Sequence, residues 1–106
     1  MLTLVHFFRI TSMIHVLIEG SVQGVGFRQF VRSQANKLDI KGWVKNLPAS
    51  PAGGPDRRVE AMFAGNRESL ELMINYCREG PFLAQVKDLE IRELPDEVFE
   101  SFEIVR

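Results

Sequence analysis

One segment of the sequence combines the residue types that bind a phosphate group. It spans residues 20–28 with the letters GSVQGVGFR, and it fits the end of a strand, a short loop and the first turn of a helix. The first amides of a helix have no partner within the helix, and the helix dipole adds partial positive charge at the same place. Gly24 and Gly26 allow the loop backbone to turn its own amides inward. An anion is therefore expected to bind in this loop.

Arg28 adds a full positive charge beside those amides. Its planar guanidinium matches two phosphate oxygens and keeps its proton near neutral pH. The spacing alone leaves two interpretations equally open, because an ordinary strand-to-helix turn also uses glycine and a first-turn arginine is commonly solvated. The glycine spacing differs from the dinucleotide-binding pattern, and no Lys-Ser or Lys-Thr pair follows as in a Walker loop.

A second candidate for chemistry is Asn46, near the end of a predicted strand. Its carboxamide can accept a hydrogen bond from water and orient that water, but it is too weak a base to remove a proton at neutral pH. Asparagine is also a common turn residue, and here it precedes Leu47 and Pro48. The residue pattern by itself favours the turn.

The apolar periodicity predicts the elements that must position these residues. Strands are predicted at residues 13–19, 41–47, 58–64, 84–93 and 101–105. Helices are predicted at residues 27–38 and from an N-cap at Asn66 to a stop at Gly80 and Pro81. This order predicts an α+β, ferredoxin-like sandwich with two helices on one face of an antiparallel sheet, in the pattern βαββαβ plus a short C-terminal strand.

The chain length of 106 residues fits one domain. We assign residues 13–106 to that domain and residues 1–12 to an N-terminal extension that we expect to be flexible. The extension is apolar, but it lacks the basic start and the small-residue cleavage site of a signal peptide. No apolar run in the sequence approaches the roughly 20 residues that cross a membrane.

Charge and composition argue against several classes of partner. The net charge of -1 argues against a dedicated nucleic-acid binder. Cys77 is the single cysteine, so no internal disulfide can form, which fits a reducing, cytoplasmic compartment. One cysteine together with His6 and His15 is a poor ligand set for a metal such as zinc.

Two stretches of the sequence resemble the signatures of the acylphosphatase family. Residues 20–28 are similar to the first signature, and residues 42–46, with the letters GWVKN, are similar to the second. Further matches are Val59 with Glu60, Gly65, Gly80 with Pro81, and residues 102–104. The resemblance extends over residues 13–106.

The resemblance implies a ferredoxin-like fold, no cofactor, no metal and two catalytic residues, Arg28 and Asn46. It also implies a phosphate-binding loop made of Ser21, Val22, Gln23, Gly24, Val25, Gly26, Phe27 and Arg28. The implied activity is metal-independent hydrolysis of the carboxyl–phosphate bond of a small-molecule acyl phosphate, by in-line attack of water. We expect such an enzyme to be a cytoplasmic monomer.

The sparse set of groups suits this reaction. The leaving carboxylate has a conjugate acid with a pKa near ~4, so it departs without a general acid. Negative charge spreads over the phosphoryl oxygens in the transition state, and positioning and electrostatics supply most of the rate.

Two other functions stay open at this point. The first is an acylphosphatase-like module that binds phosphate or carbamoyl phosphate without turnover. The second is RNA binding, because RNA-recognition domains share the fold class. Those domains need exposed aromatic residues on the two central strands, and the predicted first strand has none.

One stretch departs from the family pattern. Residues 49–56 form an apparent insertion, and Arg57 stands where the family has a glycine two residues before Val59. The insertion begins three residues after Asn46, close enough to overhang the site, so the sequence leaves its role and the substrate preference open.

Overall fold

The computed structural model describes residues 11–95 and 97–106. Its elements are β1 (Thr11–Ser21), α2 (Phe27–Lys37), β2 (Lys41–Asn46), β3 (Arg57–Asn66), α3 (Arg67–Glu79), β4 (Gln85–Leu94) and β5 (Phe102–Ile104). Each strand and helix predicted from the sequence is present, in the predicted order. Within these two ranges, no helix is long and apolar enough to cross a bilayer.

The first strand begins earlier than the sequence pattern predicts. β1 starts at Thr11 rather than at residue 13, because Thr11 and Ser12 pair with Asn66 and Gly65 of β3. The rest of the predicted flexible extension, residues 1–10, lies outside the described residues.

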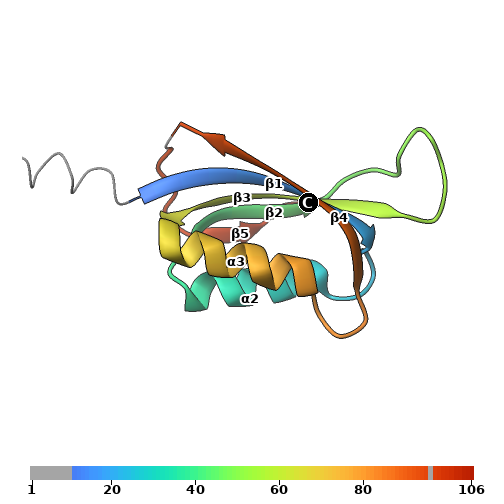
Figure 1. Cartoon of the computed structure of the whole chain (residues 1–106), viewed down its shortest axis with the longest axis horizontal. Coiled ribbons are helices and arrows are strands. Elements are labelled where there is room, and N and C mark those ends of the chain that lie inside the picture. Colours follow the sequence, from blue (N-terminus) through green and yellow to red (C-terminus); the bar gives the residue numbers. More distant parts are fainter. Residues whose placement is uncertain (1–10, 96) are drawn as a thin grey trace, which may run out of the picture.

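The five strands form one sheet in the order β4-β1-β3-β2-β5, and both helices cover the same face of it (Figure 1). β1 pairs antiparallel with β3 and β4, and β2 pairs antiparallel with β3. The ferredoxin-like sandwich predicted from the sequence is confirmed. The sheet is mixed rather than purely antiparallel, because the short β5 adds to the edge parallel to β2.

The core lies between the helices and the sheet. Alternate residues of each strand face the helices, as the two-residue period of a strand requires. The fully buried side chains include Val16, Ile18, Val59, Ala61 and Phe63 from the sheet and Val31, Ala35, Met73 and Cys77 from the helices. β5 joins this core through Phe102, whose ring stacks on that of Phe63 with 5.7 Å between centroids.

The topology brings four chain segments to one end of the sheet. β1 and β2 are both antiparallel to β3, so they run in the same direction and end on the same side. β5 is parallel to β2 and ends there as well. α2 begins there too, because only residues 22–26 separate it from the end of β1. This end of the sheet therefore collects both signatures found in the sequence.

Candidate active site

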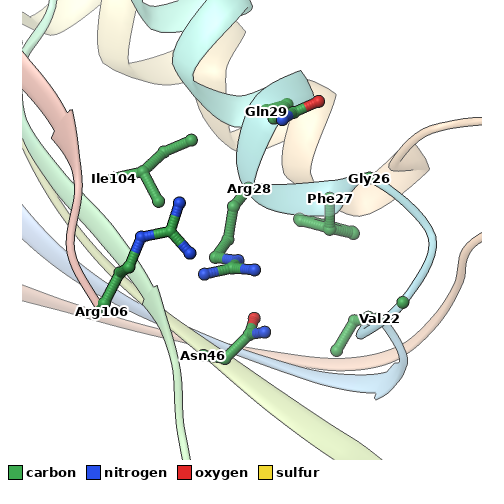
Figure 2. Close-up of a pocket in the computed structure, with 9 residues that line it drawn as sticks. Val22, Gly26, Phe27, Arg28, Gln29, Asn46, Ile104 and Arg106 are labelled. Atoms are coloured by element: carbon green, nitrogen blue, oxygen red, sulfur yellow. The ribbon is translucent and has the colours of Figure 1, made fainter.

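A pocket of about 200 Å³ opens where these segments converge (Figure 2). Its lining residues are Val22, Gly24, Gly26, Phe27, Arg28, Gln29, Asn46, Ile104 and Arg106. Arg28 and Arg106 each bring a guanidinium, and no Asp or Glu side chain of the described residues lines the pocket. The pocket is therefore electropositive, although the chain as a whole carries a net charge of -1.

The N-terminus of α2 meets this pocket without a side-chain cap. Gly26 occupies the N-cap position with φ 78° and ψ 21°, and the first turn contains no acidic residue. The Phe30 amide donates to the Gly26 carbonyl at 3.0 Å, which is the first hydrogen bond of the helix. The amides of residues 27–29 therefore have no acceptor within the helix and can donate to an anion. α3 differs, because there Asn66 Oδ1 accepts from the Ser69 amide at 2.8 Å.

The loop before α2 needs glycine for its backbone conformation. Gly24 and Gly26 have φ of 75° and 78°, in the left-handed region where residues with a Cβ are strained. A Cβ built at either position would meet no atom within 4 Å. Conformation rather than crowding therefore requires these glycines, and the space beside them stays open to a ligand.

Gln23 has a structural role that the sequence pattern did not indicate. Its Nε2 donates to the carbonyl oxygens of Leu47 and Arg58, each at 2.9 Å. These two hydrogen bonds tie the loop to the adjoining ends of β2 and β3. The side chain therefore fixes the distance between the loop and Asn46, the last residue of β2.

The structure brings five of the eight predicted loop residues to the pocket, namely Val22, Gly24, Gly26, Phe27 and Arg28. The side chain of Ser21 is exposed at the end of β1, and that of Val25 packs against the core. With Gln23, these residues shape the loop without lining the pocket.

Arg28 extends from the first turn of α2 into the pocket, and its guanidinium lies above the carboxamide of Asn46 in Figure 2. The five ion pairs among the described residues do not include it. Its side chain is half-buried, so a phosphate oxygen bound there would be partly shielded from solvent. A free guanidinium in this position can bind two oxygens of one phosphoryl group.

Asn46 reaches the pocket because of strand alternation. Val44 is fully buried under the helices, and Asn46, two residues later, faces the same side at the point where β2 ends. Its Oδ1 is buried and has no hydrogen-bond partner among the described residues. A buried acceptor without a partner is uncommon, and here it is available to a bound water or substrate.

Two pocket residues come from the C-terminal segment, which the sequence pattern did not assign to the site. Phe102 points into the core, so alternation turns Ile104 and Arg106 toward the same side of the sheet. The predicted strand at residues 101–105 already implies that alternate residues share one face. The sequence did not predict that this strand pairs with β2, and this pairing brings Ile104 and Arg106 to the pocket that Asn46 also lines.

The insertion at residues 49–56, whose role the sequence left open, does not line the pocket. The connection between β2 and β3 projects beyond the end of the sheet (Figure 1). A turn from Ser50 to Gly53, closed by a 2.9 Å backbone hydrogen bond, forms its tip. Asp56 is held at its base by Lys87 of β4 at 3.1 Å. Arg57 donates to the Gly54 and Asp56 carbonyls rather than facing the pocket.

Other titratable groups lie outside the pocket. His15 faces away from the helices and pairs with Glu60 at 2.7 Å. Cys77 is fully buried in α3, and burial raises the pKa of its thiol to about 12, so it is a core residue rather than a nucleophile. Among residues 11–95 and 97–106, no group of three or more His, Cys, Asp or Glu side chains is arranged to hold a metal ion.

Known proteins share both the sequence and the fold of this chain. Residues 14–104 match the family model described as Acylphosphatase. The acylphosphatase of Trichormus variabilis is 41% identical over 93 residues, which cover 88% of this chain and 85% of that protein. An acylphosphatase from Coxiella burnetii has a similar structure, with a TM-score of 0.82, 34% identity, and 92% and 96% of the two chains covered.

A further likeness is to one part of a larger protein. The crystal structure of full-length HypF in the phosphate- and nucleotide-bound form matches with a TM-score of 0.78 and 30% identity. The match covers 91% of this chain and 12% of that one.

Proposed function

This chain belongs to the acylphosphatase family, and we propose that it performs acyl phosphate hydrolysis in the pocket between α2, β2 and β5. The enzyme cleaves the carboxyl–phosphate bond and releases a carboxylate and inorganic phosphate. The observation that carries the assignment is the convergence of an uncapped helix N-terminus, a free guanidinium and an unpaired buried amide oxygen on one small pocket.

Arg28 and the loop amides bind the phosphoryl group in this proposal. The backbone amides of residues 23–27, up to the first residue of α2, donate hydrogen bonds to the phosphoryl oxygens on one side, and Arg28 donates to them from the other. Negative charge spreads over these oxygens in the transition state. The loop amides and Arg28 are already in place, so they stabilise this charge without reorganising. The glycine conformations and the two hydrogen bonds of Gln23 support this fixed arrangement.

Asn46 orients the attacking water. Its Oδ1 accepts a hydrogen bond from the water, whose oxygen then lies close to the phosphorus and opposite the acyl oxygen. The new P–O bond forms as the bond to the acyl oxygen breaks, and the carboxylate leaves with that electron pair. The proton of the water passes to a phosphate oxygen, since asparagine does not accept it. No general acid is needed, because the leaving carboxylate is a weak base.

The test is release of inorganic phosphate from benzoyl phosphate, measured in EDTA. We expect turnover in EDTA and a loss on the order of 10³-fold in kcat/KM for Arg28→Ala. Arg28→Lys should also fail badly, because the ammonium group lacks the planar fork. Arg32→Ala is the matched control, since Arg32 is exposed one turn further along α2.

The outcomes separate the two candidate activities. Near-normal turnover by either Arg28 variant would refute the assignment of that residue. Binding of inorganic phosphate by the wild type without any turnover would instead indicate the phosphate-binding module. The match to the acylphosphatase of Trichormus variabilis, over most of both chains, favours the hydrolase.

We further propose a cytoplasmic monomer without a nucleic-acid partner. The proposed reaction uses only groups that one chain supplies, namely Arg28, Asn46 and the loop amides. The two central strands of the sheet, β1 and β3, present no Phe, Tyr or Trp on the outer face, since their one such residue, Phe63, is fully buried under the helices, and His15 is paired with Glu60. RNA-recognition sheets depend on such exposed rings. The single, buried cysteine fits a reducing compartment.

A further inference from the structure

The pocket contains a second guanidinium that binding of one phosphoryl group does not require. Arg106 lines the pocket together with Arg28, Gln29 and Ile104. In Figure 2, Arg28 lies between the glycine-bearing loop and Arg106, so Arg106 lies further from the loop than Arg28 does. A phosphoryl group in the loop is therefore bound by Arg28, and Arg106 is left beside the remaining space.

The pairing of β5 with β2 directs Arg106 and Asn46 toward the same end of the sheet. β5 pairs with β2 so that Ile104 lies next to Val44, and the Val105 amide extends the ladder by donating to the Val44 carbonyl at 2.8 Å. Arg106 and Asn46 each follow this last pair by two residues, and both line the pocket. Both side chains face the helix side, as alternation requires. The position of Arg106 in the pocket thus follows from backbone pairing and from the anchoring of Phe102 in the core.

The charges around Arg106 leave it available to a ligand. The ion pairs of the described residues do not include Arg106, and no Asp or Glu side chain of the described residues lines the pocket. Its nearest acidic neighbour in β5, Glu103, accepts from the Ser101 hydroxyl at 3.3 Å, and alternation turns it to the opposite face of the sheet. An anion in the pocket would therefore be the counter-ion of Arg106.

We propose that Arg106 is a specificity residue that binds an anionic group on the acyl part of the substrate. The proposal rests on the function assigned above. With the phosphoryl group in the loop, the acyl group extends into the space lined by Gln29, Ile104 and Arg106. A guanidinium there favours acyl phosphates that carry a second anionic group, such as a carboxylate, over uncharged ones. Ile104 contacts the carbon chain between the two charges.

The test compares substrates that differ only in this second charge. Benzoyl phosphate is the uncharged member, and its 3-carboxy and 4-carboxy derivatives place a carboxylate at two distances on a rigid ring that cannot attack its own phosphate bond. For the wild type we expect the kcat/KM of at least one carboxy derivative to exceed that of benzoyl phosphate about tenfold at low ionic strength. Added NaCl should reduce this ratio, because the charges are close to solvent.

Arg106→Gln removes the charge and keeps much of the side chain. We expect it to lower the ratio of kcat/KM values, carboxylated over uncharged, about tenfold, and Arg106→Lys to restore part of the preference. Arg92→Gln is the matched control, because it removes an exposed guanidinium from β4, whose residues do not line the pocket. This control should keep the wild-type ratio.

Each other outcome contradicts the proposal in a distinct way. An equal loss on all three substrates for Arg106→Gln would assign Arg106 to the phosphoryl group, and an unchanged ratio would leave it without a role in recognition. If the wild type hydrolyses none of the three compounds, the proposed function itself fails. Hydrolysis of benzoyl phosphate without a response to Arg106 overturns only the specificity.

Discussion

Two side chains in this pocket have polar groups without a hydrogen-bond or ion-pair partner among the described residues. Asn46 Oδ1 is buried without a partner, and the guanidinium of Arg28 forms no ion pair with any described residue. A buried polar atom without a partner lowers stability by about 1–3 kcal/mol. A ligand that forms the missing hydrogen bonds would offset this loss. Unpaired polar groups in a pocket therefore indicate a binding site, whereas apolar core residues do not.

Asn46 and Asn66 should respond to alanine in opposite ways. Asn46→Ala removes an unpaired acceptor, so its free energy of unfolding should stay within about 1 kcal/mol of the wild type, while turnover falls about 10²-fold or more. Asn66→Ala removes the cap of α3 and should lose about 1 kcal/mol of stability while keeping turnover. Urea unfolding and phosphate release, measured on both variants, check this. A large stability loss in Asn46→Ala would show that the side chain has a structural role instead.

At the scale of the elements, the pocket lies between strand ends and the start of a helix, and the side chain of Gln23 connects these elements. Gln23 connects the loop after β1 to the ends of β2 and β3 through two hydrogen bonds to main-chain carbonyls. Both carbonyls are acceptors, so the position requires a donor. The loop geometry therefore depends on the amide group of this residue and not only on its size.

Gln23→Glu tests that requirement with little change in shape. The carboxylate would face two carbonyl oxygens and donate to neither, so we expect a loss of about 1–3 kcal/mol in the free energy of unfolding. We also expect a lower kcat/KM, because the loop amides lose their fixed position. Gln34→Glu, further along α2 and away from the pocket, is the control for the added charge. Equal effects of the two variants on kcat/KM would contradict the role of Gln23.

The sequence predicts the elements well and the contacts between distant elements less well. Periodicity, the Asn66 cap and the stop at Gly80 are local signals, and the helices and strands follow them closely. Arg28 was identified because a loop, a helix start and a family signature share one short segment. Arg106 and the side chain of Gln23 act across the sheet, and the pairing that brings them to the site joins residues far apart in the chain. The direction of the 49–56 loop has no local signal either.

At the scale of the whole molecule, one hydrophobic core holds the helices on the sheet. Cys77 lies inside this core, and burial raises the pKa of its thiol from 9.0 to about 12. In the unfolded chain the thiol ionises near pH 9, whereas in the folded protein it stays protonated to about pH 12. The stabilisation is therefore fully present below pH 9 and is lost as the pH rises from 9 to 12.

This pH dependence can be measured against a variant without the thiol. Between pH 8 and pH 10 the wild type should lose about 1.4 kcal/mol more of its free energy of unfolding than Cys77→Ala does. Urea unfolding at the two pH values gives both differences, and titration of lysine and tyrosine affects the two proteins alike. Equal losses would show that the thiol is not held in the protonated form by the core.

The proposed hydrolysis depends most on the binding of a phosphoryl group by Arg28 and the amides at the start of α2. Titration of ¹⁵N-labelled protein with inorganic phosphate, followed by amide NMR shifts, tests this directly. We expect saturable shifts at residues 23–29 and at the Asn46 side-chain amide, and their loss in Arg28→Ala but not in Arg32→Ala. Shifts confined to other parts of the chain, or shifts that persist unchanged in Arg28→Ala, would contradict the assignment of the site.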